Sequence, residues 1–139
     1  MGKGGNDGLF ALRGNDNLFG GEGKDCVLGG NKDRPLGGDK NLVGGPGNDL
    51  VWGGTYPETA KDVLSAGDGD DVVFVDNATP AKDLVSCGGG FDRVGADSKD
   101  VVAVDCEQVF IGAAASRFFH RLQDSGYFVR FFEGLADAE

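Results

Sequence analysis

Short runs of aliphatic and aromatic residues recur along residues 2–111 at intervals of about nine, and each run follows a glycine-rich polar turn. Leu50-Val51-Trp52 and Val72-Val73-Phe74 are typical. Because side chains alternate along a strand, the middle residue of each triplet should point inward and its neighbours outward. Runs this short, separated by regular turns, predict short parallel strands that stack as a solenoid with two repeats to a coil.

The turns share one pattern: two glycines, any residue, a third glycine, any residue and an Asp that comes two residues before the inward aliphatic. Residues 20–28 and 44–52 show it in full. Glycine tolerates left-handed backbone, and Asp supplies the hard oxygen ligands that Ca²⁺ prefers. A disordered acidic linker would have no need of this spacing. The carboxylates at the sixth position of the pattern are Asp7, Asp16, Asp25, Asp49, Asp71 and Asp92.

Other repeats match only in part. Residues 29–36 and 37–43 fall one and two residues short, which predicts a weak or missing calcium site, and residues 53–65 and 76–86 contain proline-bearing insertions. The partial carboxylates are Asp33, Asp62, Asp83 and Asp100. With two repeats to a coil, we expect one column of Asp16, Asp33, Asp49, Asp71 and Asp92, and a second of Asp7, Asp25, Asp62, Asp83 and Asp100. Residues 96–111 lose their glycines and are expected to form metal-free coils that end the solenoid.

The pattern resembles the RTX, or haemolysin-type, calcium-binding repeats over residues 2 to about 111. The resemblance implies an all-β fold, a right-handed parallel β-roll (β-solenoid) of about six coils. It also implies Ca²⁺ ions between successive loops, held by carboxylates and by carbonyl groups of the glycine turns. The implied metal ligands are the six full-repeat aspartates, the partial-repeat Asp33, Asp62 and Asp83, and the carbonyls of Gly21, Gly23, Gly45 and Gly47.

The bulk composition agrees with a cation-binding protein. The chain has 139 residues, a net charge of -10 and 26 glycines. An acidic chain is a poor partner for nucleic acid, whose phosphates require basic residues. No apolar run approaches the roughly 20 residues of a membrane-spanning helix. We therefore expect the chain to fold when extracellular Ca²⁺ neutralises its loops, and to act in a secreted or cell-surface protein.

Three cysteines are present, and none has the C-x-x-C spacing of a zinc site. Cys87 and Cys106 are nineteen residues apart, close to two repeats, so a two-repeat coil would stack them as neighbours. This spacing leaves two possibilities open: a disulfide, or free thiols that are partly buried.

The tail, residues 112–139, breaks the pattern and holds five of the ten phenylalanines. Residues 113–123 and 127–135 are predicted to be helices, separated by Gly126. Three roles are open for this short helical C-terminal segment: a cap packed over the last coil, an aromatic association surface, and an export signal, the last implied by the resemblance alone.

No catalytic motif is recognisable, and the single histidine, His120, is expected at the surface. The sequence therefore favours a calcium-binding repeat module that is not an enzyme. Two alternatives remain. One is a structural or adhesive subunit that self-associates into a homo-oligomer through its coil ends or its Phe-rich tail. The other is a calcium-binding fragment of a larger secreted enzyme.

Overall fold

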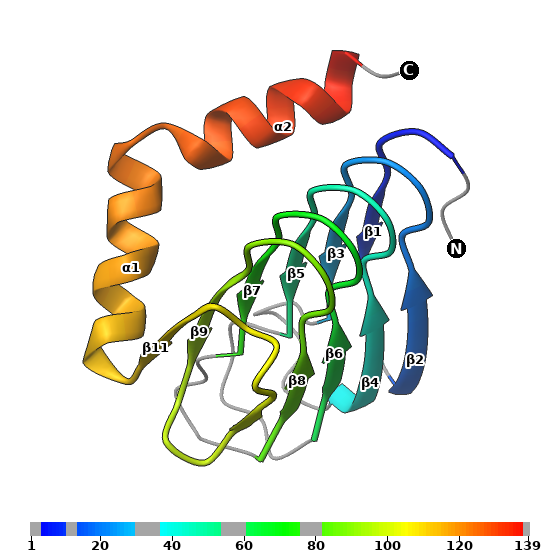
Figure 1. Cartoon of the computed structure of the whole chain (residues 1–139). Helices are drawn as coiled ribbons and strands as arrows, with labels where there is room; N and C mark the ends of the chain where they lie inside the picture. The colour runs from blue at the N-terminus through cyan, green and yellow to red at the C-terminus, as the bar shows by residue number, and fades with distance from the viewer. Residues whose placement is uncertain (1–3, 11–13, 30–36, 54–60, 76–81, 138–139) are drawn as a thin grey trace.

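A computed structural model describes residues 4–10, 14–29, 37–53, 61–75 and 82–137 of the chain. These residues form a stack of parallel strands that winds as a β-solenoid, followed by two helices (Figure 1). The predicted all-β roll with a helical C-terminal segment is therefore confirmed.

The strands form two parallel sheets. The six-stranded sheet has the order β1-β3-β5-β7-β9-β11, and the five-stranded sheet has the order β10-β8-β6-β4-β2. Because odd and even strands alternate between the sheets, the chain completes five coils and begins a sixth with β11, somewhat fewer than the sequence suggests. The strands are β1 (Gly8–Phe10), β2 (Gly14–Phe19), β3 (Cys26–Leu28), β4 (Gly37–Val43), β5 (Leu50–Trp52), β6 (Val63–Ser65), β7 (Val72–Phe74), β8 (Leu84–Ser86), β9 (Arg93–Ala96), β10 (Val101–Val102) and β11 (Gln108–Ile111).

The core between the sheets contains one inward side chain from the middle of each strand. Val27, Val51 and Val73 are fully buried in one sheet, and Leu42 and Leu64 face them from the other. Each of these aliphatic residues stacks on its equivalent in the next coil, because the strands pair in register. The predicted inward position is therefore confirmed. Ala66 and Val75, which follow β6 and β7, add to the same core.

The C-terminal segment folds into α1 (Ala113–Asp124) and α2 (Tyr127–Asp137), close to the predicted ranges. Figure 1 shows both helices outside the roll, on the side of the six-stranded sheet. They bury Phe118, Leu122 and Phe131 against the outer face of that sheet. The helices thus lie along the flank of the solenoid, and α1 packs against β9 and β11 of its last coils.

Outward-facing residues of the six-stranded sheet explain this position. Leu50, Val72 and Phe74 point away from the core, yet each is at most 3% exposed because the helices cover them. Phe74 lies 5.5 Å from the ring centroids of both Phe118 and Phe119. Among the described residues, no helix is long and apolar enough to cross a membrane.

Candidate calcium sites along one edge of the roll

Five glycine-rich loops stack on one another along one edge of the roll, each leading into an odd-numbered strand (Figure 1). Backbone hydrogen bonds hold the loops in register. The N–H of Gly21 donates to the carbonyl of Gly44 at 3.0 Å, and that of Gly45 donates to Ala66 at 2.9 Å. The loops comprise residues 4–7, 20–25, 44–49, 66–71 and 87–92.

The third glycine of each turn allows the loops to approach closely. Gly47 has φ +128°, and a Cβ atom at this position would overlap the carbonyl oxygen of Gly23 in the preceding loop. The same overlap recurs at Gly69 against Gly47 and at Gly90 against Gly69. The carbonyl oxygens therefore form a row that faces the next loop. Gly21, Gly23, Gly45 and Gly47, the expected carbonyl donors, all lie in these stacked turns.

Three further candidate carbonyl ligands, Gly5, Gly67 and Gly69, were missed by sequence reasoning. All three have positive φ, and their carbonyl oxygens lie against a glycine of the next loop as those of the expected glycines do. The repeat of Gly67 and Gly69 begins with Ala66, which breaks the leading glycine pair of the pattern. The Gly-x-Gly spacing before Asp71 was nevertheless present and could have identified them.

A column of carboxylates runs along the same edge. The backbone N–H of each loop aspartate donates to Oδ1 of the aspartate in the following loop. The four bonds are Asp7 to Asp25 at 2.8 Å, Asp25 to Asp49 at 2.8 Å, Asp49 to Asp71 at 2.7 Å, and Asp71 to Asp92 at 3.0 Å. Four of these side chains, Asp25, Asp49, Asp71 and Asp92, are fully buried.

The second oxygen of each buried carboxylate has no such partner. Among the residues that the structure describes, Oδ2 of Asp25, Asp49, Asp71 and Asp92 is buried and accepts no hydrogen bond. A buried carboxylate oxygen without a partner is costly, and a hard cation is the partner that relieves this cost. The donor set, carboxylate and carbonyl oxygen only, is the one that Ca²⁺ selects. The residues therefore fit a calcium ion.

The leading glycine keeps space open beside these oxygens. A Cβ on Gly20 would lie 2.5 Å from both Asp25 Oδ2 and the Gly44 carbonyl oxygen. A Cβ on Gly44 would lie 2.5 Å from both Asp49 Oδ2 and the Ala66 carbonyl oxygen. Each glycine thus leaves room beside a carboxylate Oδ2 atom and a backbone carbonyl oxygen. In the fourth and fifth loops the equivalent positions hold Ala66 and Cys87, which carry a Cβ atom.

Burial controls the protonation of the carboxylates in the metal-free roll. It raises the pKa of Asp49 from its usual 3.8 to about 7 and that of Asp71 to about 8, because the charged form is desolvated and lies beside other aspartates. Backbone N–H bonds oppose the rise. The pKa values of Asp25 and Asp92 are raised for the same first reason. Burial thus disfavours the charged form of all four carboxylates in the metal-free roll.

These shifts predict opposite pH dependences with and without calcium. A raised folded-state pKa stabilises the metal-free roll at low pH, and this contribution is lost as the pH rises through about 7 to 8. In EDTA, the free energy of unfolding should therefore fall between about pH 5 and pH 9. Calcium displaces the same protons, so calcium affinity should rise with pH. Calorimetric titration near pH 7 in two buffers of different ionisation enthalpy measures the released protons, and identical heats would contradict the prediction.

The remaining predicted carboxylates do not belong to this edge. Asp62 and Asp83 lie at the opposite edge, where the N–H of Asp62 donates to Asp83 Oδ1 at 2.8 Å. Asp83 in turn donates to Asp100 Oδ1 at 3.1 Å. Asp16 lies in β2 beside Lys40 of β4, and Asp33 lies outside the described residues. Among the described loops, the positive-φ glycine turns occur only at the first edge, apart from Gly112 and Gly126 beside the helices.

The predicted pairing of the two columns was wrong. Asp7 and Asp25 share a column with Asp49, Asp71 and Asp92, not with Asp62 and Asp83. The reason lies in residues 29–43. Because β3 pairs directly with β5, this segment contributes a single half-coil, that of β4, where two short repeats would have contributed two. Every later repeat therefore lies at the opposite edge from the one that the sequence predicted.

The carboxylate column ends at residues 105–107. Asp105 accepts hydrogen bonds from the N–H groups of Cys87 at 3.1 Å and Gly88 at 2.9 Å, which lower the pKa of its carboxyl group. Glu107 accepts the N–H of Asp92 at 2.8 Å. These two carboxylates take the places that a further glycine loop would fill.

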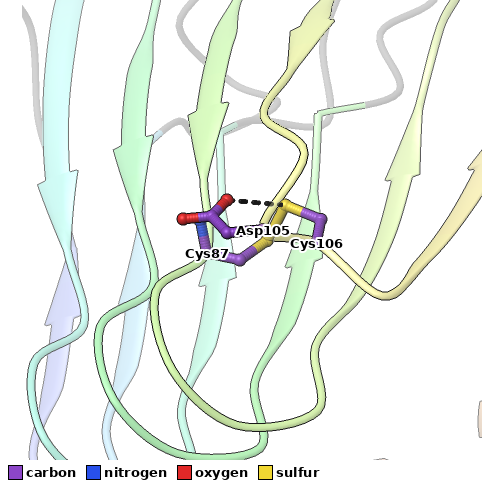
Figure 2. Close-up of side chains that lie close together, drawn as sticks. All are labelled: Cys87, Asp105 and Cys106. Atoms are coloured by element: carbon purple, nitrogen blue, oxygen red, sulfur yellow. Dashed lines mark hydrogen bonds between the residues drawn. A yellow bond between two sulfur atoms is a disulfide. The ribbon is translucent and has the colours of Figure 1, made fainter.

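Cys87 and Cys106 form a disulfide beside Asp105, with a Cα–Cα distance of 5.2 Å (Figure 2). Of the two possibilities that their spacing left open, a disulfide or free thiols, the structure contains the disulfide. Cys106 Sγ lies 3.8 Å from Asp105 Oδ1, a contact without a proton because the sulfur is oxidised. The three side chains cluster as metal ligands would, but no thiolate is available and both Asp105 oxygens bind backbone. We therefore assign this cluster a structural role.

Removing the disulfide should weaken the last coil. Closing a loop of this length stabilises a fold by about 3 kcal/mol in the chain-entropy model. The Cys87→Ser, Cys106→Ser double variant should therefore unfold at lower urea concentration in saturating calcium. Reducing agent should shift the parent protein by the same amount and leave the variant unchanged. Equal urea midpoints for the oxidised and reduced parent protein would contradict the prediction.

Comparison with known protein families agrees with this geometry. A family model, described as RTX calcium-binding nonapeptide repeat in four copies, matches residues 1–31, 37–55 and 59–77. Searches of curated proteins and of solved structures found no significant match. The loop of residues 87–92 lies beyond the matched segments, yet its glycines and Asp92 stack as those of the matched loops do. With its stacked glycine turns and buried aspartate column, the chain belongs to the family of RTX calcium-binding nonapeptide repeats.

Proposed function

We propose that this chain is a non-catalytic module that folds on binding extracellular Ca²⁺, as part of a secreted or surface protein. The ions would bind between successive loops, held by the column of Asp7, Asp25, Asp49, Asp71 and Asp92 together with the glycine carbonyls. One observation carries the proposal: the buried Oδ2 atoms that accept no hydrogen bond within the described chain. Five loops enclose four gaps, so we propose up to four ions at this edge.

The energy available from calcium is of the right size to decide folding. An ion that binds only the folded chain contributes RT ln(1 + [Ca]/Kd), about 1.4 kcal/mol at ten times Kd. Four such sites would contribute about 6 kcal/mol, which is comparable to the whole stability of a typical domain. Four divalent ions would also offset eight of the ten net negative charges. Without calcium the acidic loops repel one another, and burial disfavours the charged form of their carboxylates.

Two features support an extracellular location. Calcium modules that fold at extracellular concentrations have dissociation constants of about 0.1–1 mM, whereas free calcium inside cells would leave such sites empty. The Cys87–Cys106 disulfide fits an oxidising compartment. The chain would thus be unfolded before export and folded after it.

The helical segment favours a folding role over an association role. Of the described aromatic residues of the tail, Phe118 and Phe131 are buried against the chain's own sheet, and Phe119, Tyr127 and Phe128 are partly buried beside them. Lys24, in the second calcium loop, places its Nζ 4.7 Å from the ring centroid of Phe131. Order in the loops and docking of α2 should therefore occur together.

A calcium titration tests the proposal. At about pH 9, where protonation of the buried carboxylates no longer stabilises the metal-free roll, EDTA-treated protein should give the circular dichroism of an unfolded chain. Calcium should then produce a cooperative transition to strand structure. Trp52, the only tryptophan, packs against Phe74 and Phe119 and reports helix docking in the same titration. Calorimetry should count several ions per chain. A chain that is folded in EDTA and gives no heat with calcium would refute the proposal.

Asp49→Asn should have opposite effects in the two states. Asn can still accept the N–H bond from Asp25, but it carries no charge. In EDTA near pH 9 the variant should be more stable than the parent, because one buried carboxylate fewer must ionise. In calcium it should be less stable, and its calcium midpoint should rise by about tenfold. Asp124→Asn, which removes the same charge from the exposed surface of α1, is the control. Similar behaviour of the two variants would contradict a ligand role for Asp49.

A further inference from the structure

The C-terminal end of the roll leaves part of the core uncovered. Val109 and Ile111 of β11 pair in register with Val94 and Ala96, which are fully buried core residues. In the part of the chain that the structure describes, β11 is the last strand of its sheet, so Val109 and Ile111 remain 41% and 43% exposed. Val104, in the turn before β11, is fully exposed. We call Val104, Val109 and Ile111 the end face.

The backbone of β11 is also open on one side. Gln108 and Gly112 donate their N–H groups to carbonyls on the β9 side, at 3.0 and 2.9 Å. Because alternate residues of a parallel strand bond to the same neighbour, the N–H and C=O groups of Val109 and Ile111 point away from β9. An edge strand of this kind is a template for pairing with another chain.

A second copy cannot simply continue the roll from this end. Head-to-tail stacking would require its first glycine loop, residues 4–7, to lie on the fifth loop, residues 87–92. Asp105 and Glu107 already accept N–H groups of the fifth loop and occupy that position. The glycine-loop edge is therefore closed to a further coil, whereas β11 remains open.

Two copies can meet instead about a two-fold axis that passes between their β11 strands. Antiparallel pairing would place Val109 of each copy opposite Ile111 of the other, with the two Phe110 residues at the axis. Both Val109–Ile111 pairs would then exchange backbone hydrogen bonds. Residues that lie opposite each other point to the same face of a sheet, so each copy would cover the exposed core of the other.

The charges at this end suit the same arrangement. Asp105 and Glu107 are exposed in the turn at the glycine-loop edge, and Lys99 is exposed in the turn at the opposite edge. Because antiparallel pairing exchanges the two edges, the Lys99 turn of each copy would face the acidic turn of the other. A net charge of -10 opposes association of copies in general, and these opposite charges therefore favour this one orientation.

We propose that the C-terminal end of the roll is a homodimer interface, in which two copies of this chain pair through β11 and the end face. The interface lies outside the stacked calcium loops, so it requires a folded last coil and no shared ion. Association stops at two copies, because each copy has one such end.

Sedimentation equilibrium of calcium-saturated protein, with folding checked by circular dichroism, tests the proposal. The average mass should rise with concentration from 14.4 kDa to twice that value and then stay constant. Val109→Lys should raise the dimer dissociation constant by about tenfold or more, because it places a charge in the end face. Val63→Lys is the matched control, since Val63 is 44% exposed on β6, away from this end, and should leave the dimer unchanged.

Lys99→Glu tests the orientation without altering the core. It should raise the dissociation constant by about tenfold, and by less at high salt. Lys82→Glu is its control, because Lys82 is an exposed lysine that precedes β8 as Lys99 precedes β10, one coil further from the end. A monomer at all concentrations, growth beyond the dimer, or equal effects within either pair of variants would each overturn the proposal.

Discussion

Gly47→Ala should nearly abolish calcium-induced folding. At φ +128° an alanine is strained, and its Cβ would overlap the carbonyl oxygen of Gly23, a backbone atom that cannot move aside. The second and third loops would have to separate, which would break the Asp25 to Asp49 hydrogen bond and open the gap proposed for calcium. We expect a loss of about 4 kcal/mol. Strand ellipticity followed against calcium concentration measures this loss.

Gly4→Ala provides the control. Gly4 belongs to the first loop, has no positive φ, and a Cβ there would meet nothing within 4 Å. This variant removes a loop glycine without closing a gap, so its calcium midpoint should match that of the parent. If both variants responded alike, the loss would reflect glycine content in general, and the close approach of loops at Gly47 would not be its cause.

Phe74→Ala should be the most damaging substitution outside the loops. Phe74 is 3% exposed, and its ring contacts Trp52, Phe118, Phe119 and Phe128. Removing a buried ring of this kind costs about 3–5 kcal/mol, from lost burial and from the cavity that remains. Trp52 emission should shift to the red as α1 loosens, and urea unfolding in calcium should give the free-energy loss.

Phe10→Ala is the control, because it removes a phenylalanine from the same sheet without removing a buried side chain. Phe10 occupies the same outward row of the same sheet as Phe74, yet it is 65% exposed. Its replacement should cost less than about 1 kcal/mol. Equal costs for the two variants would mean that the helices do not dock on this flank in solution.

The repeat pattern was sufficient to predict the roll and the aspartates of the loops. Position six of the pattern identified Asp25, Asp49 and Asp71, because only a repeated turn places a carboxylate at the same depth in each coil. The alternation within the strand triplets likewise identified Val51 and Val73 as core residues. Both inferences depend on a local spacing of residues that recurs in each neighbouring coil.

Features that depend on distant packing were not predictable in the same way. Leu50 and Val72 were expected to face outward, and only the docked helices show why an outward position is apolar. The mistaken column assignment had a similar origin. The number of half-coils in residues 29–43 depends on which strands pair, and β3 pairs with β5 whatever the length of the segment between them. The composition of the loops does not show which strands pair.

The bonds between loop aspartates all run in one direction along the chain. From Asp7 to Asp71, each backbone N–H donates to a carboxylate that belongs to the following coil, and Glu107 accepts the last N–H from Asp92. A ribosome or an export channel that delivers the chain from its N-terminus therefore releases every donor before its acceptor. Each loop aspartate can consequently complete its bond only after the following coil has emerged.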